Sequence, residues 1–203
     1  MTAHANDGFD LVVLLDRVGR AVGTQPRATV HHADTPLHLA FSCYAVDPDQ
    51  RLLVTRRAVD KATFPGLWTN TVCGHPAPGE SLPQAVRRRA ADELGLTVQE
   101  LRLLLPRYTY RAEMAGIVEH EWCPVLLAPV RGDVMCTPSA AEVEDFAWVP
   151  WSEMIELAQD PPPQWSPWAM EQVRLLDELG PDPLAWQPAD PSLLPAALHE
   201  PPP

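Results

Sequence analysis

Apolar residues recur at helical intervals between Ser81 and Leu94. Pro83 falls in the first turn of this stretch, where its missing backbone N–H breaks no helical hydrogen bond, and Gly95 follows the last turn. The pattern therefore predicts a helix over residues 81–94. Its apolar positions are Leu82, Ala85, Val86, Ala90 and Leu94.

Apolar runs of strand length fill most of the chain on either side of this helix. Residues 10–16 lead into a tight turn toward residues 21–23, which predicts an N-terminal hairpin. A second hairpin is predicted because the turn-forming sequence Asp-Pro-Asp-Gln separates residues 37–46 from residues 51–56. Further strands are predicted at 101–111, 116–130 and 145–149.

Helical signals return toward the C-terminus. Residues 151–158 are amphipathic, and a last helix is predicted from Ser166, as N-cap before a proline, to Gly180. Eight of the 24 prolines lie in residues 181–203, which excludes regular helix or sheet there. The chain therefore divides into an N-terminal tail (1–9), one α/β (α+β) domain (10–180) and a Pro-rich tail (181–203) that is draped on the surface or partly disordered.

The charge balance narrows the classes of function. Fifteen Lys and Arg against 27 Asp and Glu give a net charge of -12, so no basic field exists to hold nucleic acid or an anionic membrane. No signal segment or membrane-length apolar run is apparent, which predicts a cytoplasmic location. The cysteines at 43, 73, 123 and 136 form no close pair, so neither a disulfide scaffold nor a zinc–thiolate site is indicated.

The densest group of reactive side chains lies just before the predicted helix. Cys73 and His75 flank Gly74 at a turn that ends in Pro76. Reactive groups at such a turn are typical of a functional site. A buried Cys73 that packs as a small hydrophobic residue is the alternative, and this segment alone leaves both open.

A pair of carboxylates lies in the predicted strand 116–130. Because side chains alternate along a strand, Glu119 and Glu121 share one face and His120 points to the other. Apolar neighbours such as Trp122 favour burial, where paired carboxylates need a cation. A solvated edge strand is the alternative.

Two histidines precede the second hairpin, and either alone is more typical of a structural histidine than of a ligand. His31 and His38, with His75, Glu119 and Glu121, form a set of three imidazoles and two carboxylates. That set suits a six-coordinate divalent ion with one open position. Zinc usually takes fewer ligands, which favours Mn2+ or Mg2+.

From Gly74 onward the chain resembles the Nudix box, a loop and helix that hold a divalent cation against a diphosphate. Arg89 stands where the box has a glutamate and Asp92 replaces another, so Glu93 is the carboxylate that clearly remains. The resemblance implies diphosphate binding and argues against hydrolysis. The matching positions are Gly74, Glu80, Arg88, Ala90, Asp92, Glu93, Gly95 and Leu96.

This depleted box, with Cys-Gly-His-Pro before it and Glu-x-Glu after it, resembles the type I isopentenyl diphosphate isomerases. The resemblance runs from about Leu11 to Gly180 and includes HHADTPLHLAF, TNTVCGHP, YRAEMAGIVEHEWCP and WSPW. It implies a Nudix fold, with a mixed β-sheet packed between α-helices and an N-terminal β extension. It also implies interconversion of isopentenyl and dimethylallyl diphosphate through alkene protonation and allylic deprotonation.

The resemblance assigns catalytic roles to four residues. Cys73 and Glu121 would transfer protons and Tyr110 would assist Glu121. Trp168 would face the carbocation, an intermediate that needs an aromatic face and exclusion of water. Without the resemblance, the favoured interpretation of Trp168 is that it is one of seven tryptophans that fill the core.

The resemblance also assigns binding roles. Arg57 and Lys61 would bind the diphosphate, and Arg27 stands where family members often carry lysine. Glu93 would hold Mg2+ on the diphosphate, while His32 and His120 receive no role. The residues of the other metal site, for Mn2+ or another divalent ion, would be His31, His38, His75, Glu119 and Glu121.

Two rival functions stay open at this point. A Nudix hydrolase would cleave a diphosphate linkage, and a non-catalytic module on the same fold would only bind a diphosphate. All three hypotheses expect a small-molecule diphosphate as partner, and the oligomeric state is left open.

Overall fold

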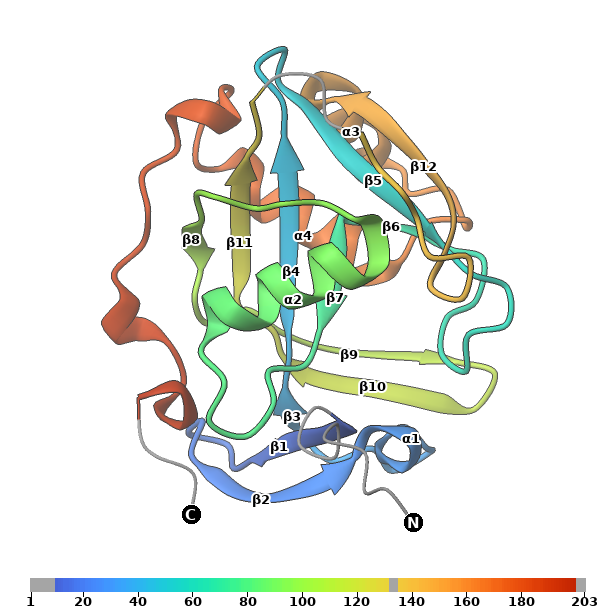
Figure 1. Cartoon of the computed structure of the whole chain (residues 1–203), viewed down its shortest axis with the longest axis vertical. Helices are drawn as coiled ribbons and strands as arrows, with labels where there is room; N and C mark the ends of the chain where they lie inside the picture. The colour runs from blue at the N-terminus through green and yellow to red at the C-terminus, as the bar shows by residue number, and fades with distance from the viewer. Residues whose placement is uncertain (1–9, 132–134, 200–203) are drawn as a thin grey trace.

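A seven-stranded sheet forms the centre of the computed structural model, which describes residues 10–131 and 135–199 (Figure 1). The strand order is β12-β5-β4-β11-β8, with β6 on β5 and β7 on β4. Only β4 and β11 pair in parallel among these described strands. The strands are β4 (Phe41–Val46), β5 (Arg51–Arg57), β6 (Trp68–Thr69), β7 (Val72–Gly74), β8 (Arg102–Leu105), β11 (Val125–Pro129) and β12 (Val143–Pro150).

A second sheet of five strands carries the N-terminal extension and lies below the first in Figure 1. Its order is β2-β1-β3-β10-β9, and β3 runs parallel to β10. The predicted N-terminal hairpin is confirmed as β1 and β2. The strands are β1 (Leu11–Leu15), β2 (Ala21–Pro26), β3 (His38–Leu39), β9 (Thr109–Met114) and β10 (Ile117–Trp122).

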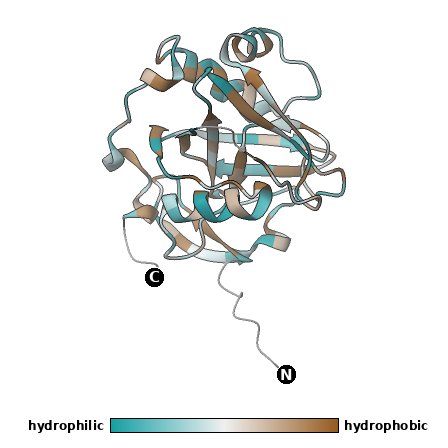
Figure 2. Cartoon of the chain, turned by 45° about the horizontal axis from the view of Figure 1, so that its top comes forward, coloured by the Kyte–Doolittle hydropathy of each residue, from teal (hydrophilic) through white to brown (hydrophobic). Residues whose placement is uncertain are grey.

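Helices cover both faces of the central sheet, as expected for a mixed sheet between helices. In Figure 1, α2 (Leu82–Leu94) crosses in front of β4, and α4 (Pro167–Asp177) lies behind it. Residues alternate along β4, so Phe41 packs toward α2 and Tyr44 toward α4. Figure 2 shows hydrophobic central strands behind an α2 that carries many hydrophilic residues. The other helices are α1 (Arg27–Val30) and α3 (Trp151–Gln159).

The helix predicted over residues 81–94 is confirmed, together with its end signals. Ser81 and Gln84 form a capping box at the start. Gly95 ends the helix in the left-handed conformation with φ 62°. Local sequence therefore determines this element, which follows directly after the reactive turn.

Three predicted strands are wrong in extent, because each is two strands in different sheets. Residues 37–46 divide at Ala40 into β3 and β4. Residues 101–111 break around Pro106 into β8 and β9, and residues 116–130 break at Cys123-Pro124 into β10 and β11. The apolar runs continue through each break because both sheets are buried there. At the second and third breaks, Pro106 and Pro124 lack a backbone donor where the chain changes sheets.

The predicted last helix is confirmed as α4, but the Ser166 side chain does not cap it. The Ser166 hydroxyl instead donates to Thr69 Oγ1 at 3.0 Å. Residues 181–199 form short 3₁₀ turns along the surface, where Trp186 packs edge-on against Trp151 at 5.1 Å. These turns are η2 (Pro183–Ala185), η3 (Pro191–Leu193) and η4 (Ala196–Leu198).

The predicted tail at residues 1–9 lies outside the described residues. Within residues 10–131 and 135–199, none of the helices combines the length and the apolar character needed to cross a bilayer.

Candidate active site

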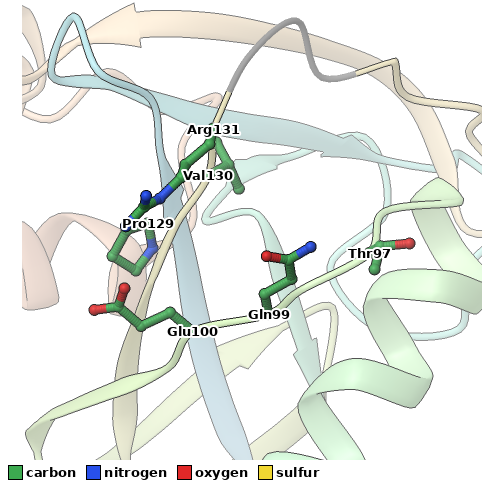
Figure 3. A pocket seen from close by; sticks show the side chains of 6 residues that line it. All are labelled: Thr97, Gln99, Glu100, Pro129, Val130 and Arg131. Atoms are coloured by element: carbon green, nitrogen blue, oxygen red, sulfur yellow. The ribbon is translucent and has the colours of Figure 1, made fainter.

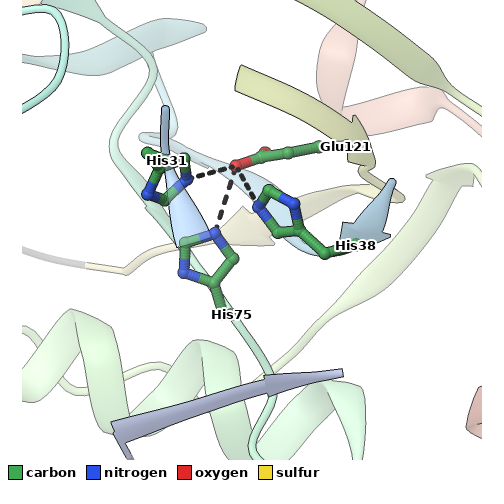
Figure 4. A group of neighbouring side chains, drawn as sticks. All are labelled: His31, His38, His75 and Glu121. Carbon is green, nitrogen blue, oxygen red and sulfur yellow. Dashed lines mark hydrogen bonds and ion pairs between the residues drawn. The ribbon is translucent and has the colours of Figure 1, made fainter. Parts of the chain in front are cut away.

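Three imidazoles surround one carboxylate oxygen at the junction of the two sheets (Figure 4). The Oε1 atom of Glu121 lies 3.1 Å from His75 Nε2, 3.4 Å from His38 Nε2 and 3.9 Å from His31 Nε2. One potential ligand atom from each of the four side chains lies within 4.8 Å of all the others. The fold thus brings together residues that are up to 90 positions apart in the sequence.

Strand pairing sets this geometry. His38 on β3 pairs directly with Glu121 on β10, so their side chains project from neighbouring positions. His31 follows α1, and Thr35 fixes the segment between the two histidines by donating to Val118 O at 2.6 Å. His75 enters from the turn after β7.

The donor atoms fit a divalent cation. His38 Nδ1 must donate to Pro36 O at 2.9 Å, which leaves the Nε2 lone pair directed at the carboxylate. Nε2 of His31 and of His38 are both buried without a hydrogen-bond partner among the described residues. Buried lone pairs around a carboxylate repel each other unless a cation lies between them, so these residues form a candidate divalent-metal site.

The titration of two members agrees with a metal-ligating state. Burial would raise the pKa of Glu121, but the surrounding imidazoles of His31, His38 and His75 lower it well below its usual range. Burial lowers the pKa of His75 to about 4. A charged carboxylate and a neutral imidazole are the forms that bind a metal.

Glu119 stands outside this four-residue group, although the sequence analysis included it in the metal site. It shares a face of β10 with Glu121, as the alternation predicted, but lies two residues before it in the strand. The Tyr110 hydroxyl lies 2.9 Å from an oxygen of each carboxylate and links them. Burial and the neighbouring Glu121 raise the pKa of Glu119.

Cys73 lies on β7 and is held as a neutral thiol. Its Sγ donates to Asn70 Oδ1 at 2.9 Å and lies 3.6 Å from Ser42 Oγ. Burial raises the pKa of this thiol to about 11, and the charge of Glu121 adds to the increase. The half-buried thiol therefore stays protonated near neutral pH, and Glu121 lies near enough for its charge to act on the thiol.

Aromatic side chains form a wall beside Tyr110. Trp168 is 1% exposed, stacks on Tyr110 with ring centroids 5.4 Å apart, and donates Nε1–H to Thr69 Oγ1. Phe64 packs edge-on against Trp168 at 5.0 Å. The Arg57 guanidinium carbon lies 5.8 Å from the Trp168 ring centroid, so this face already attracts a cation.

The three cationic residues predicted to bind the diphosphate each contact a different partner. Arg57 donates to Thr63 O at 2.8 Å and so holds the loop after β5. Lys61, from the same loop, bonds to Glu142. Arg27, at the start of α1, is half exposed and lies 3.6 Å from Asp10.

Glu93 of the box-like segment lies in an ion-pair network on α2. Arg89 bonds to Glu93 one turn away and also lies 3.4 Å from Glu142. Burial raises the pKa of Glu93 against the opposing effect of Arg89. Arg89 and Glu142 were not identified as site residues from the sequence.

Another ion pair shapes the reactive turn. Arg88 donates to both oxygens of Glu80, at 2.7 and 2.8 Å, and Arg88 Nη2 also donates to His75 O at 3.3 Å. Glu80 in turn accepts from Ala77 N. The pair therefore connects the start of α2 to the backbone of His75.

Two further residues near Cys73 were missed by sequence reasoning. Asn70 directs its amide nitrogen to the Cys43 and Val72 carbonyls, which orients its oxygen toward the thiol. Ser42 accepts from Gln172 and contacts Cys73. Neither has a local pattern that signals a site, because their partners lie on separate strands and helices. His120 lies on the other face of β10, as predicted.

The hollow shown in Figure 3 lies away from this cluster. It has a volume of about 220 Å³, and Glu100 and Pro129 are among its lining residues. None of the predicted site residues lines it. The chemistry of the candidate site therefore resides in the histidine–glutamate cluster and the groups around Cys73.

Comparison with known proteins gives one consistent result. The NUDIX domain family matches residues 36–169. An isopentenyl-diphosphate Delta-isomerase of Mycolicibacterium vanbaalenii is 55% identical over 177 residues, which cover 86% of this chain and 95% of that protein. The isopentenyl-diphosphate Delta-isomerase of Saccharopolyspora erythraea is 51% identical over 190 residues, covering 93% and 97% respectively.

Solved structures agree at the level of the fold. A Deinococcus radiodurans protein, DR0079, superposes with a TM-score of 0.61 at 18% identity, covering 81% of this chain and 98% of its own. A MutT protein from Methanosarcina mazei gives a TM-score of 0.57 at 16% identity, covering 71% and 96%. These similarities confirm the predicted Nudix fold.

Proposed function

The chain belongs to the NUDIX family and, within it, to the isopentenyl-diphosphate Delta-isomerases, and we propose that Cys73 and Glu121 carry out its proton transfers. It is an isomerase that interconverts isopentenyl diphosphate and dimethylallyl diphosphate. The single observation that supports these roles best is a protonated Cys73 thiol within reach of the charge of the Glu121 carboxylate. An acid and a base in one site are what a shift of a double bond requires.

The proposed metal ligands are His31, His38, His75 and Glu121, with Glu119 in a supporting position. The two orphaned imidazole nitrogens and the low pKa of Glu121 support this assignment. A bound divalent ion, Mn2+ or Mg2+, would supply positive charge that fixes the imidazoles and keeps Glu121 ionised.

Cys73 is the proposed proton donor in the direction from isopentenyl diphosphate to dimethylallyl diphosphate. Its S–H bond would break as a C–H bond forms at the terminal alkene carbon, which leaves a tertiary carbocation. Burial supports this role, because it raises the pKa of Cys73 and so keeps the proton on sulfur before the substrate arrives, while Asn70 fixes the position of the thiol.

Glu121 is the proposed acceptor of the allylic proton. Removal of that proton moves the C–H electron pair into the new double bond and neutralises the carbocation. Tyr110 donates to Glu121 and would orient the carboxylate, as well as link it to Glu119 as a route for the proton. In the reverse reaction the two roles exchange.

Trp168 is the proposed stabiliser of the carbocation. Its ring is buried, so water that would trap the cation is excluded, and its π face is the negative part of its quadrupole. The position of Arg57 near that face supports the assignment, because it shows the ring facing a positive group already.

The diphosphate is proposed to lie among the cationic side chains that the sequence assigned to it. Arg27, Arg57 and Lys61 supply positive charge in an otherwise acidic chain, and Glu93 is the proposed ligand for Mg2+ on the diphosphate. The cytoplasmic location predicted from the sequence remains a prediction.

One experiment tests the proposed reaction and its rivals. Isopentenyl diphosphate is incubated with the protein in deuterated water, and product, label and inorganic phosphate are measured. Isomerisation predicts dimethylallyl diphosphate that carries deuterium, without phosphate release. Phosphate release without labelled product would support a Nudix hydrolase, and binding without either change would support a non-catalytic module.

A further inference from the structure

Glu142 lies where cationic side chains from separate elements meet. Lys61, from the loop after β5, bonds to Glu142 Oε2, and Arg89 Nη2 from α2 lies 3.4 Å from the same oxygen. Partial burial would raise the pKa of Glu142, but Lys61, Arg89 and the nearby Arg27 lower it. One carboxylate thus contacts two cations, Lys61 and Arg89, beside the proposed diphosphate end, and Arg27 lies near enough for its charge to act on it.

The formal charges of the four side chains in this ion-pair network cancel. Lys61 and Arg89 contribute two positive charges, and Glu93 and Glu142 contribute two negative charges. These four side chains therefore offer an incoming diphosphate little net attraction while both carboxylates stay in place. For the diphosphate to bind tightly to Lys61 and Arg89, one of the two carboxylates has to lose its contacts with them.

Accessibility distinguishes the two carboxylates. The Glu93 side chain is 9% exposed and pairs with Arg89 along α2, whereas the Glu142 side chain is 23% exposed. The backbone of Glu142 is fixed independently, because its N–H donates to Ser139 O and its carbonyl accepts from Ala58 N. The Glu142 side chain can therefore swing away without disturbing the start of β12.

The arrangement also leaves a donor unused. Arg89 Nε is buried and has no hydrogen-bond partner among the described residues. In the described part of the chain, the Glu142 carboxylate contacts only Nη2 of Arg89 and leaves Nε without an acceptor. A phosphate group has enough oxygens to accept hydrogen bonds from both Nη2 and Nε.

We propose that Glu142 is a displaceable counter-ion, whose carboxylate is replaced on Lys61 and Arg89 by phosphate oxygens of the substrate. This inference rests on the proposed function, since it names a binding role within the same site. Glu142 then acts as a positioning residue: it holds the cations together before binding and lowers affinity for the diphosphate. Release of product is correspondingly faster, because the carboxylate competes for the same donors.

The test is calorimetric titration of the full chain with inorganic pyrophosphate, with and without Mg2+. Glu142→Gln is expected to bind about tenfold more tightly than the wild type under both conditions, since a competing charge is lost. Glu144→Gln is the matched control, because it removes the same charge two residues away, from a carboxylate 3.5 Å from Arg56 at the surface. It is expected to change affinity less than about twofold.

The opposite results overturn the proposal. Unchanged or weaker binding by Glu142→Gln, or no pyrophosphate binding by any form of the chain, contradicts displacement. Weaker binding only when Mg2+ is present would identify Glu142 as a cation ligand instead. Glu142→Ala repeats the measurement in case the glutamine variant does not fold, and loss of structure would not produce tighter binding.

Steady-state kinetics separates this inference from the proposed function. Glu142→Gln is expected to lower KM for isopentenyl diphosphate without raising kcat, because product is also held more tightly. A wild type that does not isomerise the substrate would contradict the proposed function. A wild type that isomerises it, with a KM unaffected by Glu142→Gln, would contradict only the role of Glu142.

Discussion

The thiol of Cys73 donates a hydrogen bond to the side-chain oxygen of Asn70 across 2.9 Å. Asn70 cannot reverse its amide, because its nitrogen already donates to the carbonyls of Cys43 and Val72. The oxygen also accepts from Thr69, which holds it in place. This contact fixes the position of the thiol, and burial raises the pKa of Cys73 to about 11, so the proposed acid keeps its proton before any substrate binds.

Replacing Cys73 by alanine should therefore abolish isomerisation. We expect Cys73→Ala to lower kcat by at least about 10²-fold, the usual contribution of a positioned acid or base. The measurement is the rate of formation of deuterated dimethylallyl diphosphate in deuterated water.

The chain contains its own controls for this experiment. Cys43→Ala removes a buried thiol on the neighbouring strand and Cys136→Ala a partly buried one far along the chain. Both should retain most of the activity and lose only packing. Wild-type isomerisation by Cys73→Ala would remove this residue from the mechanism.

His38→Ala should empty the proposed metal site. Its Nε2 is a buried, unpartnered ligand atom, and its removal should lower both bound divalent metal and turnover. Metal content by mass spectrometry should fall well below one equivalent. His120→Ala is the control, because His120 lies on the opposite face of β10, and a full metal content in His38→Ala would contradict the assignment.

Glu93→Gln should weaken binding of pyrophosphate only when Mg2+ is present. The substitution preserves size and removes the charge that would hold the cation. Calorimetry at varied Mg2+ concentrations measures the effect, and the metal in the histidine cluster should be retained. Unchanged Mg2+ dependence would show that Glu93 serves only as the partner of Arg89.

Much of the fold and much of the site could be predicted from the sequence, for local reasons. The helix at 81–94 has both its capping signals and its apolar period within one segment. The alternation of β10 correctly placed Glu119 and Glu121 on one face. Sequence alone could not tell that Glu121 reaches the imidazoles and Glu119 stops beside them, because this depends on the pairing of β3 with β10.

The missed features depend on contacts between distant segments. The breaks at Ala40 and at Cys123-Pro124 lie within continuous apolar runs, so no change of pattern marks where the chain changes sheets. Glu142 and Glu144 look alike in the sequence, yet Glu142 holds Lys61 and Arg89 while Glu144 lies at the surface near Arg56.

The pair of Glu80 and Arg88 should give the fold a defined pH dependence. Burial opposes ionisation, but Arg88 and the Ala77 N–H lower the pKa of Glu80 below its usual value. Its stabilising contribution is thus present above the usual glutamate pKa and is lost as pH falls through the lower folded-state pKa. Glu80→Gln should cost about 1–2 kcal/mol in urea unfolding at pH 7, and the difference from wild type should shrink below about pH 4. An equal difference at both pH values would contradict the ion-pair explanation.

Gly19→Ala should show how strongly the C-terminal segment is held against the N-terminal hairpin. Gly19 has φ 81°, and an added Cβ would lie 2.8 Å from Pro195 Cβ and 3.2 Å from Trp122. Its carbonyl also accepts from Ala197 N, so the two segments cannot easily separate.

Gly116→Ala is the matched control. Gly116 has a similar backbone conformation, with φ 79°, but an added Cβ would meet no atom within 4 Å. Gly116→Ala should therefore cost about 1 kcal/mol from backbone strain alone, and Gly19→Ala about 3 kcal/mol because strain and overlap add. Urea unfolding of both variants measures the difference, and equal costs would mean that the segment around Pro195 moves aside freely.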